Sequence, residues 1–184
     1  TALAPEGVMD RSVMDWLFAA AVLMLAAWGF ASFGAAMDVY EKAILVAAVP
    51  SVIALAWFWQ PLRWLLVLVG LATWGAMALY LQHLDAHGAD LAHAEQVFWL
   101  KYFLSSQSAI LWMSVLFFMS TVFYWIGLVA RSATATKLGS RLAWAGIFMA
   151  LVGTLVRWFE SHQIAPDIGH IPVSNLYEVF VLFA

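Results

Sequence analysis

The sequence predicts an all-α fold, a polytopic transmembrane helical bundle, and three observations support this class. The 184 residues are 65% hydrophobic and only 10% charged, whereas a water-facing domain usually carries about a quarter charged residues. Charge-free runs recur at lengths near the roughly 20 residues that a helix needs to cross the hydrocarbon core. The 11 Trp, 13 Phe and 5 Tyr are typical of chains whose rings settle near lipid headgroups.

The charge-free runs predict about five complete membrane spans and a truncated sixth. The complete spans are expected at residues 16–36, 43–62, 64–84, 102–130 and 142–159, and only the last contains a charge, Arg157 near its end. The sixth begins near Leu176 and reaches only Ala184, which is too short to cross. We therefore expect residues 1–184 to form a single transmembrane domain, the N-terminal fragment of a longer protein.

The basic residues in the connections predict the orientation, since short cytoplasmic loops carry an excess of Lys and Arg. With a cytoplasmic N-terminus in a bacterial inner (plasma) membrane, the outer side holds only Lys42 and Lys101, with Arg157 near the boundary. The inner side then holds five basic residues: Arg11, Arg63, Arg131, Lys137 and Arg141. In this interpretation residues 131–141 form an inner loop.

Two further features of the spans and connections can be predicted. Residues Leu91, Ala94, Phe98 and Tyr102 recur at helical spacing, which predicts a short helix lying on the membrane surface. Small residues let membrane helices approach closely, so we expect close packing at Gly70, Gly75, Gly146 and Gly153.

Composition excludes several kinds of function. The net charge of −3 includes no basic block, so nucleic acid is not an expected partner. The absence of cysteine excludes disulfides and thiolate metal sites within the chain. The lipid bilayer is the partner that composition does predict.

Three histidines lie in and beside the second outer connection, at His83, His87 and His93. On a continuous helix His83 and His87 would share a face and could bind one metal ion. Gly88 interrupts such a helix, so we expect a solvated loop and no metal site.

A second polar stretch, residues 157–178, follows the fifth span. Helix capping explains part of it, because Ser174 or Asn175 can cap the sixth span and Glu178 suits the helix dipole. Arg157 could pair with Glu160 three residues later or with Glu178. From the residues alone, a loop with helix caps accounts for the whole stretch.

Within this stretch the string GHIPVSNLYE, residues 169–178, resembles the signature G-H-x-P-x-S-N/D-L-Y-E of the CcsA/ResC family. These proteins are the haem-handling membrane subunits of the system II cytochrome c synthase. The pair Arg157-Trp158 also resembles the family. The resemblance implies a set of residues that support the haem site without ligating iron: His170, Pro172, Ser174, Asn175, Tyr177, Glu178 and Arg157.

The resemblance also implies a function. Such a subunit presents haem b at the periplasmic face for covalent attachment to apocytochrome c, together with a ResB-like membrane partner. The family's Trp-rich segment ending in Trp-Asp, with its flanking haem-ligating histidines, does not occur here, so the axial ligands are expected outside this chain. No catalytic residue is visible in this segment.

Two other classes of function remain open. A membrane transporter would use Pro50 and Arg157 as broken-helix and substrate-site features. A non-catalytic membrane scaffold or respiratory-complex subunit would need neither residue.

Overall fold

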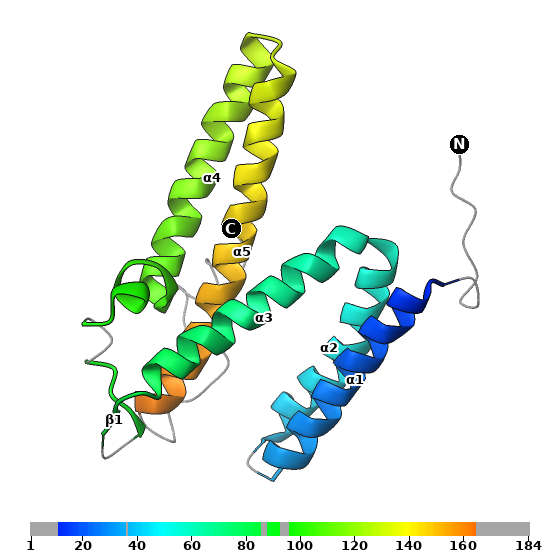
Figure 1. Cartoon of the computed structure of the whole chain (residues 1–184), viewed down its shortest axis with the longest axis vertical. Coiled ribbons are helices and arrows are strands. Elements are labelled where there is room, and N and C mark those ends of the chain that lie inside the picture. Colours follow the sequence, from blue (N-terminus) through cyan, green and yellow to red (C-terminus); the bar gives the residue numbers. More distant parts are fainter. Residues whose placement is uncertain (1–10, 36, 86–87, 93–95, 165–184) are drawn as a thin grey trace. The chain divides into compact units, whose positions relative to one another are not determined.

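The computed structural model describes residues 11–35, 37–85, 88–92 and 96–164, which are mostly helical (Figure 1). Among these residues, five helices are long and apolar enough to cross a membrane: α1 Val13–Phe33, α2 Val39–Phe58, α3 Gln60–Tyr80, α4 Ser106–Val129 and α5 Ala133–Ile164. This confirms the predicted all-α transmembrane fold. The expected sixth span, from Leu176, lies outside the described residues.

The chain divides into two compact units, Thr1–Leu66 and Val67–Ala184, and the division falls within α3. The first unit contains α1, α2 and the beginning of α3. The second contains the rest of α3, the short strands β1 Leu84–Asp85 and β2 Gly88–Ala89, the π-helix η3 Leu100–Leu104, α4 and α5.

In the first unit, capping boxes fix where the first two helices begin. The Ser12 hydroxyl accepts the Asp15 N–H, and the Asp15 carboxylate accepts the Ser12 N–H. Asp38 and Glu41 make the same reciprocal pair at the start of α2. These caps satisfy backbone N–H groups that have no partner within the helix.

A polar cluster joins the start of α1 to the turn between α2 and α3. Asp15 is buried and forms an ion pair with Arg63, whose Nε also donates to the Ala56 carbonyl at 3.0 Å. The Trp57 indole donates to the Asp15 carbonyl at 3.1 Å, and Arg11 donates to the Trp57 carbonyl at 2.9 Å. Arg11 and Arg63 therefore lie at the same end of this unit, as the predicted topology requires.

In the second unit, α4 and α5 form an antiparallel pair (Figure 1). Small residues repeat every seven positions along the contact face of α5, and we call Gly139, Gly146 and Gly153 the glycine stripe. The facing residues of α4 repeat at the same interval, at Ser106, Met113, Ser120 and Gly127. A seven-residue repeat keeps one face of each helix turned toward its partner.

The glycine stripe brings the two helices close together. A Cβ atom added at Gly146 would lie 3.0 Å from the Phe117 ring, and one at Gly153 would lie 3.2 Å from Ala109 Cβ. The Ser120 hydroxyl also donates to the Gly139 carbonyl at 2.8 Å. The close-packing prediction is confirmed for Gly146 and Gly153.

Gly70 and Gly75 on α3 behave differently from the glycine stripe. A Cβ atom at either position would have no neighbour within 4 Å in the described part of the chain. The prediction of close packing at these two glycines is therefore wrong among the described residues, because a small residue permits a close approach but does not create one.

The prediction that residues 131–141 form a loop is wrong, because α5 already begins at Ala133. Lys137 and Arg141 are good helix formers, and their long side chains can carry the charge away from the helix axis. A charge in the sequence therefore marks the end of an apolar run but does not end a helix. The 32 residues of α5 correspond to about 48 Å at 1.5 Å per residue.

The connection between α3 and α4 also differs from the expectation of a short surface helix. After α3 ends, β1 and β2 pair antiparallel, with Leu84 opposite Ala89, and Leu91 lies in a turn. Among the described residues of this connection, helical backbone is found from Phe98 and leads into η3. The Ala89 N–H donates to the Gln163 side chain at 2.9 Å, so this connection packs against the end of α5.

Candidate functional site

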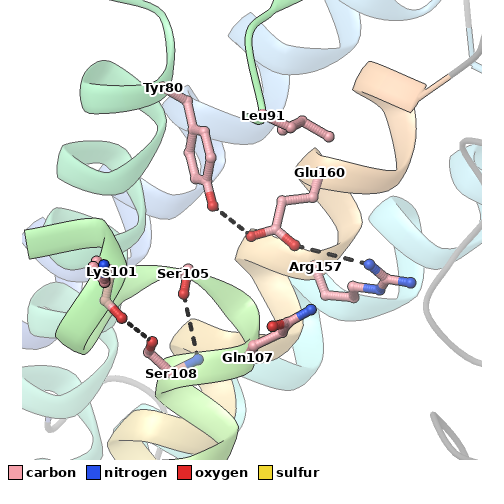
Figure 2. Close-up of a pocket in the computed structure, with 8 residues that line it drawn as sticks. All are labelled: Tyr80, Leu91, Lys101, Ser105, Gln107, Ser108, Arg157 and Glu160. Carbon is pink, nitrogen blue, oxygen red and sulfur yellow. Dashed lines mark hydrogen bonds and ion pairs between the residues drawn. The ribbon is translucent and has the colours of Figure 1, made fainter. Parts of the chain in front are cut away.

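A polar cavity of about 450 Å³ lies where the end of α3, the η3–α4 junction and α5 meet (Figure 2). All of its lining residues belong to the second unit. They are Tyr80, Leu91, Lys101, Ser105, Gln107, Ser108, Arg157 and Glu160. One buried carboxylate and two cationic side chains thus share this cavity.

Glu160 is buried, with only 8% of its surface exposed, and its carboxylate accepts three hydrogen bonds. The Tyr80 hydroxyl donates to Oε1 at 2.6 Å, and the Ser106 N–H donates to the same oxygen at 3.0 Å. The Ser106 hydroxyl donates to Oε2 at 2.5 Å. A buried carboxylate is costly without such partners, so these three donors allow the charge to remain inside the protein.

The helix pairing explains why Glu160 occupies this position. It follows Gly153 by seven residues and therefore continues the glycine stripe on the contact face of α5. Ser106 begins α4 and has the same place in the facing repeat. The first N–H groups of a helix have no acceptor within the helix and can bind an anion. The Glu160 carboxylate accepts one of them, the N–H of Ser106.

Arg157 lies one turn before Glu160 and lines the same cavity (Figure 2). Its Nη1 is 3.9 Å from Glu160 Oε2, which confirms the predicted Arg157–Glu160 pair. The Arg157 side chain is 39% exposed, and solvent-exposed pairs of this kind contribute little stability. The guanidinium therefore lies beside the Glu160 carboxylate and remains accessible from the cavity.

The junction between η3 and α4 fixes the opposite wall of the cavity. Ser105 caps α4, and its hydroxyl accepts the Ser108 N–H at 3.3 Å. The Ser108 hydroxyl donates to the Lys101 carbonyl at 2.5 Å, as Figure 2 shows. Phe103 stacks on Trp112 with ring centroids 5.7 Å apart. These contacts hold Lys101 beside the cavity, and its ammonium lies 5.8 Å from the Tyr102 ring centroid.

A second cavity of about 470 Å³ lies between α3 and α5 and is mainly apolar. Aromatic side chains from both helices line it, namely Trp74, Trp158 and Phe159, together with His162. The Thr73 hydroxyl is buried beside this cavity and has no hydrogen-bond partner among the described residues. Since Arg157 and Trp158 are neighbours, α5 presents the polar and the apolar cavity on adjacent parts of its surface.

The structure describes only one residue of the set that the family resemblance implies. That residue is Arg157, which lines the polar cavity. The other six fall outside the described residues: His170, Pro172, Ser174, Asn175, Tyr177 and Glu178.

The three histidines of the connection between α3 and α4 are described only in part. His83 lies in a bend after the end of α3, and Gly88 adopts φ 133° in β2. Residues 84 and 85 are extended, so the continuous helix that would align His83 with His87 does not form. His87 and His93 lie outside the described residues. Within the described ranges, no three His, Cys, Asp or Glu side chains gather into a metal-binding group.

Sequence reasoning missed Tyr80 and Ser106 as partners of Glu160. Tyr80 is 80 residues and Ser106 is 54 residues away from Glu160 along the chain, and no local pattern links positions so far apart. The seven-residue spacing from Gly146 through Gly153 to Glu160 was a usable signal, because it places a carboxylate on a helix contact face.

Comparison with known proteins finds no matching family model, no matching curated protein and no matching solved structure.

Proposed function

We propose that this chain is part of the haem-handling membrane subunit of a cytochrome c synthase. The observation that carries the proposal is the string of residues 169–178, with its resemblance to the CcsA/ResC signature. In this role the protein presents haem b at the outer face of a bacterial plasma membrane for attachment to apocytochrome c. A ResB-like membrane protein is its partner, and the axial haem ligands lie outside this chain.

The chemistry of the two cavities supports a ligand of this kind. Haem combines a flat apolar ring with two carboxylates. The polar cavity offers the cations Arg157 and Lys101, which are suitable partners for carboxylates. The adjacent apolar cavity offers aromatic faces at Trp74 and Trp158. α5 ends at Ile164, five residues before the signature string begins.

The residues of this chain then bind and orient the ligand. The guanidinium of Arg157 donates to a propionate, and the ammonium of Lys101 neutralises its charge. Glu160 already accepts three hydrogen bonds, so it fixes α5 against α4 and α3 and keeps Arg157 in place. The attachment chemistry itself belongs to haem and the cysteines of the apocytochrome.

Replacing Arg157 with glutamine in the full-length protein tests this function. We expect haem content after purification to fall about tenfold and cytochrome c maturation to fall with it, because a charge-assisted hydrogen bond is lost. The folded yield is a separate measure of stability, to which the pair with Glu160 contributes little because the Arg157 side chain is 39% exposed. Haem absorbance, maturation and yield are measured on the same preparations.

Arg141→Gln is the matched control for this experiment, since it removes the same charge from the same helix near its opposite end. Normal haem content in Arg157→Gln would contradict the proposal. An equal loss in both variants would attribute the effect to net charge and would also contradict it.

The proposed orientation has its own test, because the natural chain has no cysteine. Single cysteines at Thr134 and at Ala92, both exposed, should differ in their reaction with a membrane-impermeant thiol reagent added to intact cells. We expect the cysteine at position 92 to react and the one at position 134 to be protected until the membrane is opened. The reverse pattern would invert the topology.

A further inference from the structure

The end of the α4–α5 pair that includes the connecting turn is strongly basic. No acidic residue occurs between residues 102 and 159, whereas Arg131, Lys137 and Arg141 are all exposed at this end. Their side chains make no hydrogen bond or ion pair with the described part of the chain. The 24 residues of α4 extend about 36 Å, so Arg131, just past its end, lies at the level of the lipid headgroups.

The backbone of Arg131 has an unusual conformation. Its φ is 49°, and the N–H of the next residue, Ser132, donates to the Gly127 carbonyl at 3.0 Å. This is the bond of a helix-ending turn whose left-handed position glycine usually occupies, because a side chain there is strained. An arginine therefore stands where glycine would give the more stable turn.

Arg131 also lines a cavity of about 510 Å³ between α4 and α5. The other lining residues are Tyr124, Gly127, Leu128 and Thr136. Tyr124 is 42% exposed, and the Thr136 hydroxyl donates to the Ser132 carbonyl at 3.2 Å. One cation and two hydroxyl-bearing side chains thus line this cavity together with Gly127 and Leu128.

Lys137 and Arg141 do not belong to this cavity. Each is two residues from Gly139, which packs against α4, and two residues correspond to about 200° around a helix. They therefore lie on the far face of α5. Arg131 is the cation that the geometry assigns to the cavity, and the other two add only to the surrounding positive potential.

We propose that this cavity binds the headgroup of an anionic phospholipid such as phosphatidylglycerol. The Arg131 guanidinium donates to the phosphate, the Tyr124 hydroxyl donates to a second phosphate oxygen, and the start of an acyl chain lies against Leu128. Charge complementarity and headgroup depth support a lipid as the occupant, since basic pockets between membrane helices bind such headgroups. This site is independent of the proposed function.

Arg131→Gly tests the site without endangering the fold, because glycine suits the left-handed turn. The purified chain in neutral detergent is titrated with short-chain phosphatidylglycerol, and bound lipid is counted by native mass spectrometry. We expect the affinity to fall about fivefold, while the Tm without lipid stays the same or rises. Tyr124→Phe should also weaken binding, because it keeps the ring that contacts Gly139 and removes the hydroxyl.

Three results would overturn the proposal. Wild-type affinity in Arg131→Gly would show that the cavity does not bind the headgroup. A loss as large in Lys137→Gln would show that the attraction is diffuse and not specific to the cavity. Equal competition by inorganic phosphate would identify a free-anion site and not a lipid site.

Discussion

Replacing Glu160 with alanine is expected to destabilise the second unit more than any other single change discussed above. The variant leaves the Tyr80 hydroxyl and both donors of Ser106 without their acceptor in a buried site. Unpaired buried donors cost about 1–3 kcal/mol each and are not additive, so we expect a loss of about 2–4 kcal/mol in the free energy of unfolding. Thermal unfolding of the purified chain in detergent measures it.

A double-mutant cycle with Tyr80→Phe separates the energy of the Tyr80–Glu160 hydrogen bond from the other effects of removing the Glu160 side chain. Phenylalanine keeps the ring that lies 5.7 Å from the Phe159 ring centroid and removes only the hydroxyl. If the network is as described, Glu160→Ala should cost about 1 kcal/mol less in the Tyr80→Phe background, because that donor is already gone. Strict additivity of the two changes, or a wild-type Tm in Glu160→Ala, would refute the network.

Leucine at Gly146 is expected to force α4 and α5 apart. An added Cβ atom alone would lie 3.0 Å from the Phe117 ring, and the longer side chain would need space that the ring occupies. Overpacking of this kind costs about 1–3 kcal/mol. The Tm of the purified chain should fall accordingly, and Gly153→Leu should behave in the same way because Ala109 lies opposite.

The matched control for this experiment lies on α3. Gly70→Leu and Gly75→Leu introduce the same side chain into another membrane helix, at positions with open space around an added Cβ atom. These variants should unfold at or above the wild-type temperature, since leucine also favours the helix over glycine. Equal destabilisation at Gly75 and Gly146 would mean that the glycine stripe is not a packing surface.

The five helices that the structure describes as long enough to span a membrane could be predicted from the sequence, because the hydrocarbon core requires a fixed length of apolar helix. The residues at which the first two helices begin were less predictable. α1 begins three residues before the apolar run at 16–36, and α2 begins four residues before the run at 43–62. In both cases the helix begins with a capping box, whose carboxylate residue, Asp15 or Glu41, lies in the first turn of the helix. Hydrophobicity alone cannot detect such a start, although the capping pattern can.

Within the candidate site, only the contact between residues close together in the sequence could be predicted. The Arg157–Glu160 pair spans three residues of one helix, and helical geometry places such residues side by side. The carboxylate's other partners come from α3 and α4, and their proximity depends on how the helices pack. Packing of membrane helices is determined by shape and by a few polar contacts, which a single sequence does not reveal.

The alignment of Glu160 with the start of α4 has a consequence for the assembly of this helical hairpin. A slip of α4 along α5 by one turn, about 5.4 Å, would separate Ser106 from the carboxylate that accepts its N–H and hydroxyl. The same slip would move Phe117 away from Gly146 and place other α4 side chains against the glycines. Only one register satisfies both the polar contact and the glycine contacts. Lys101 precedes α4 and Arg157 belongs to α5, so that register also determines how far apart the two cations are held.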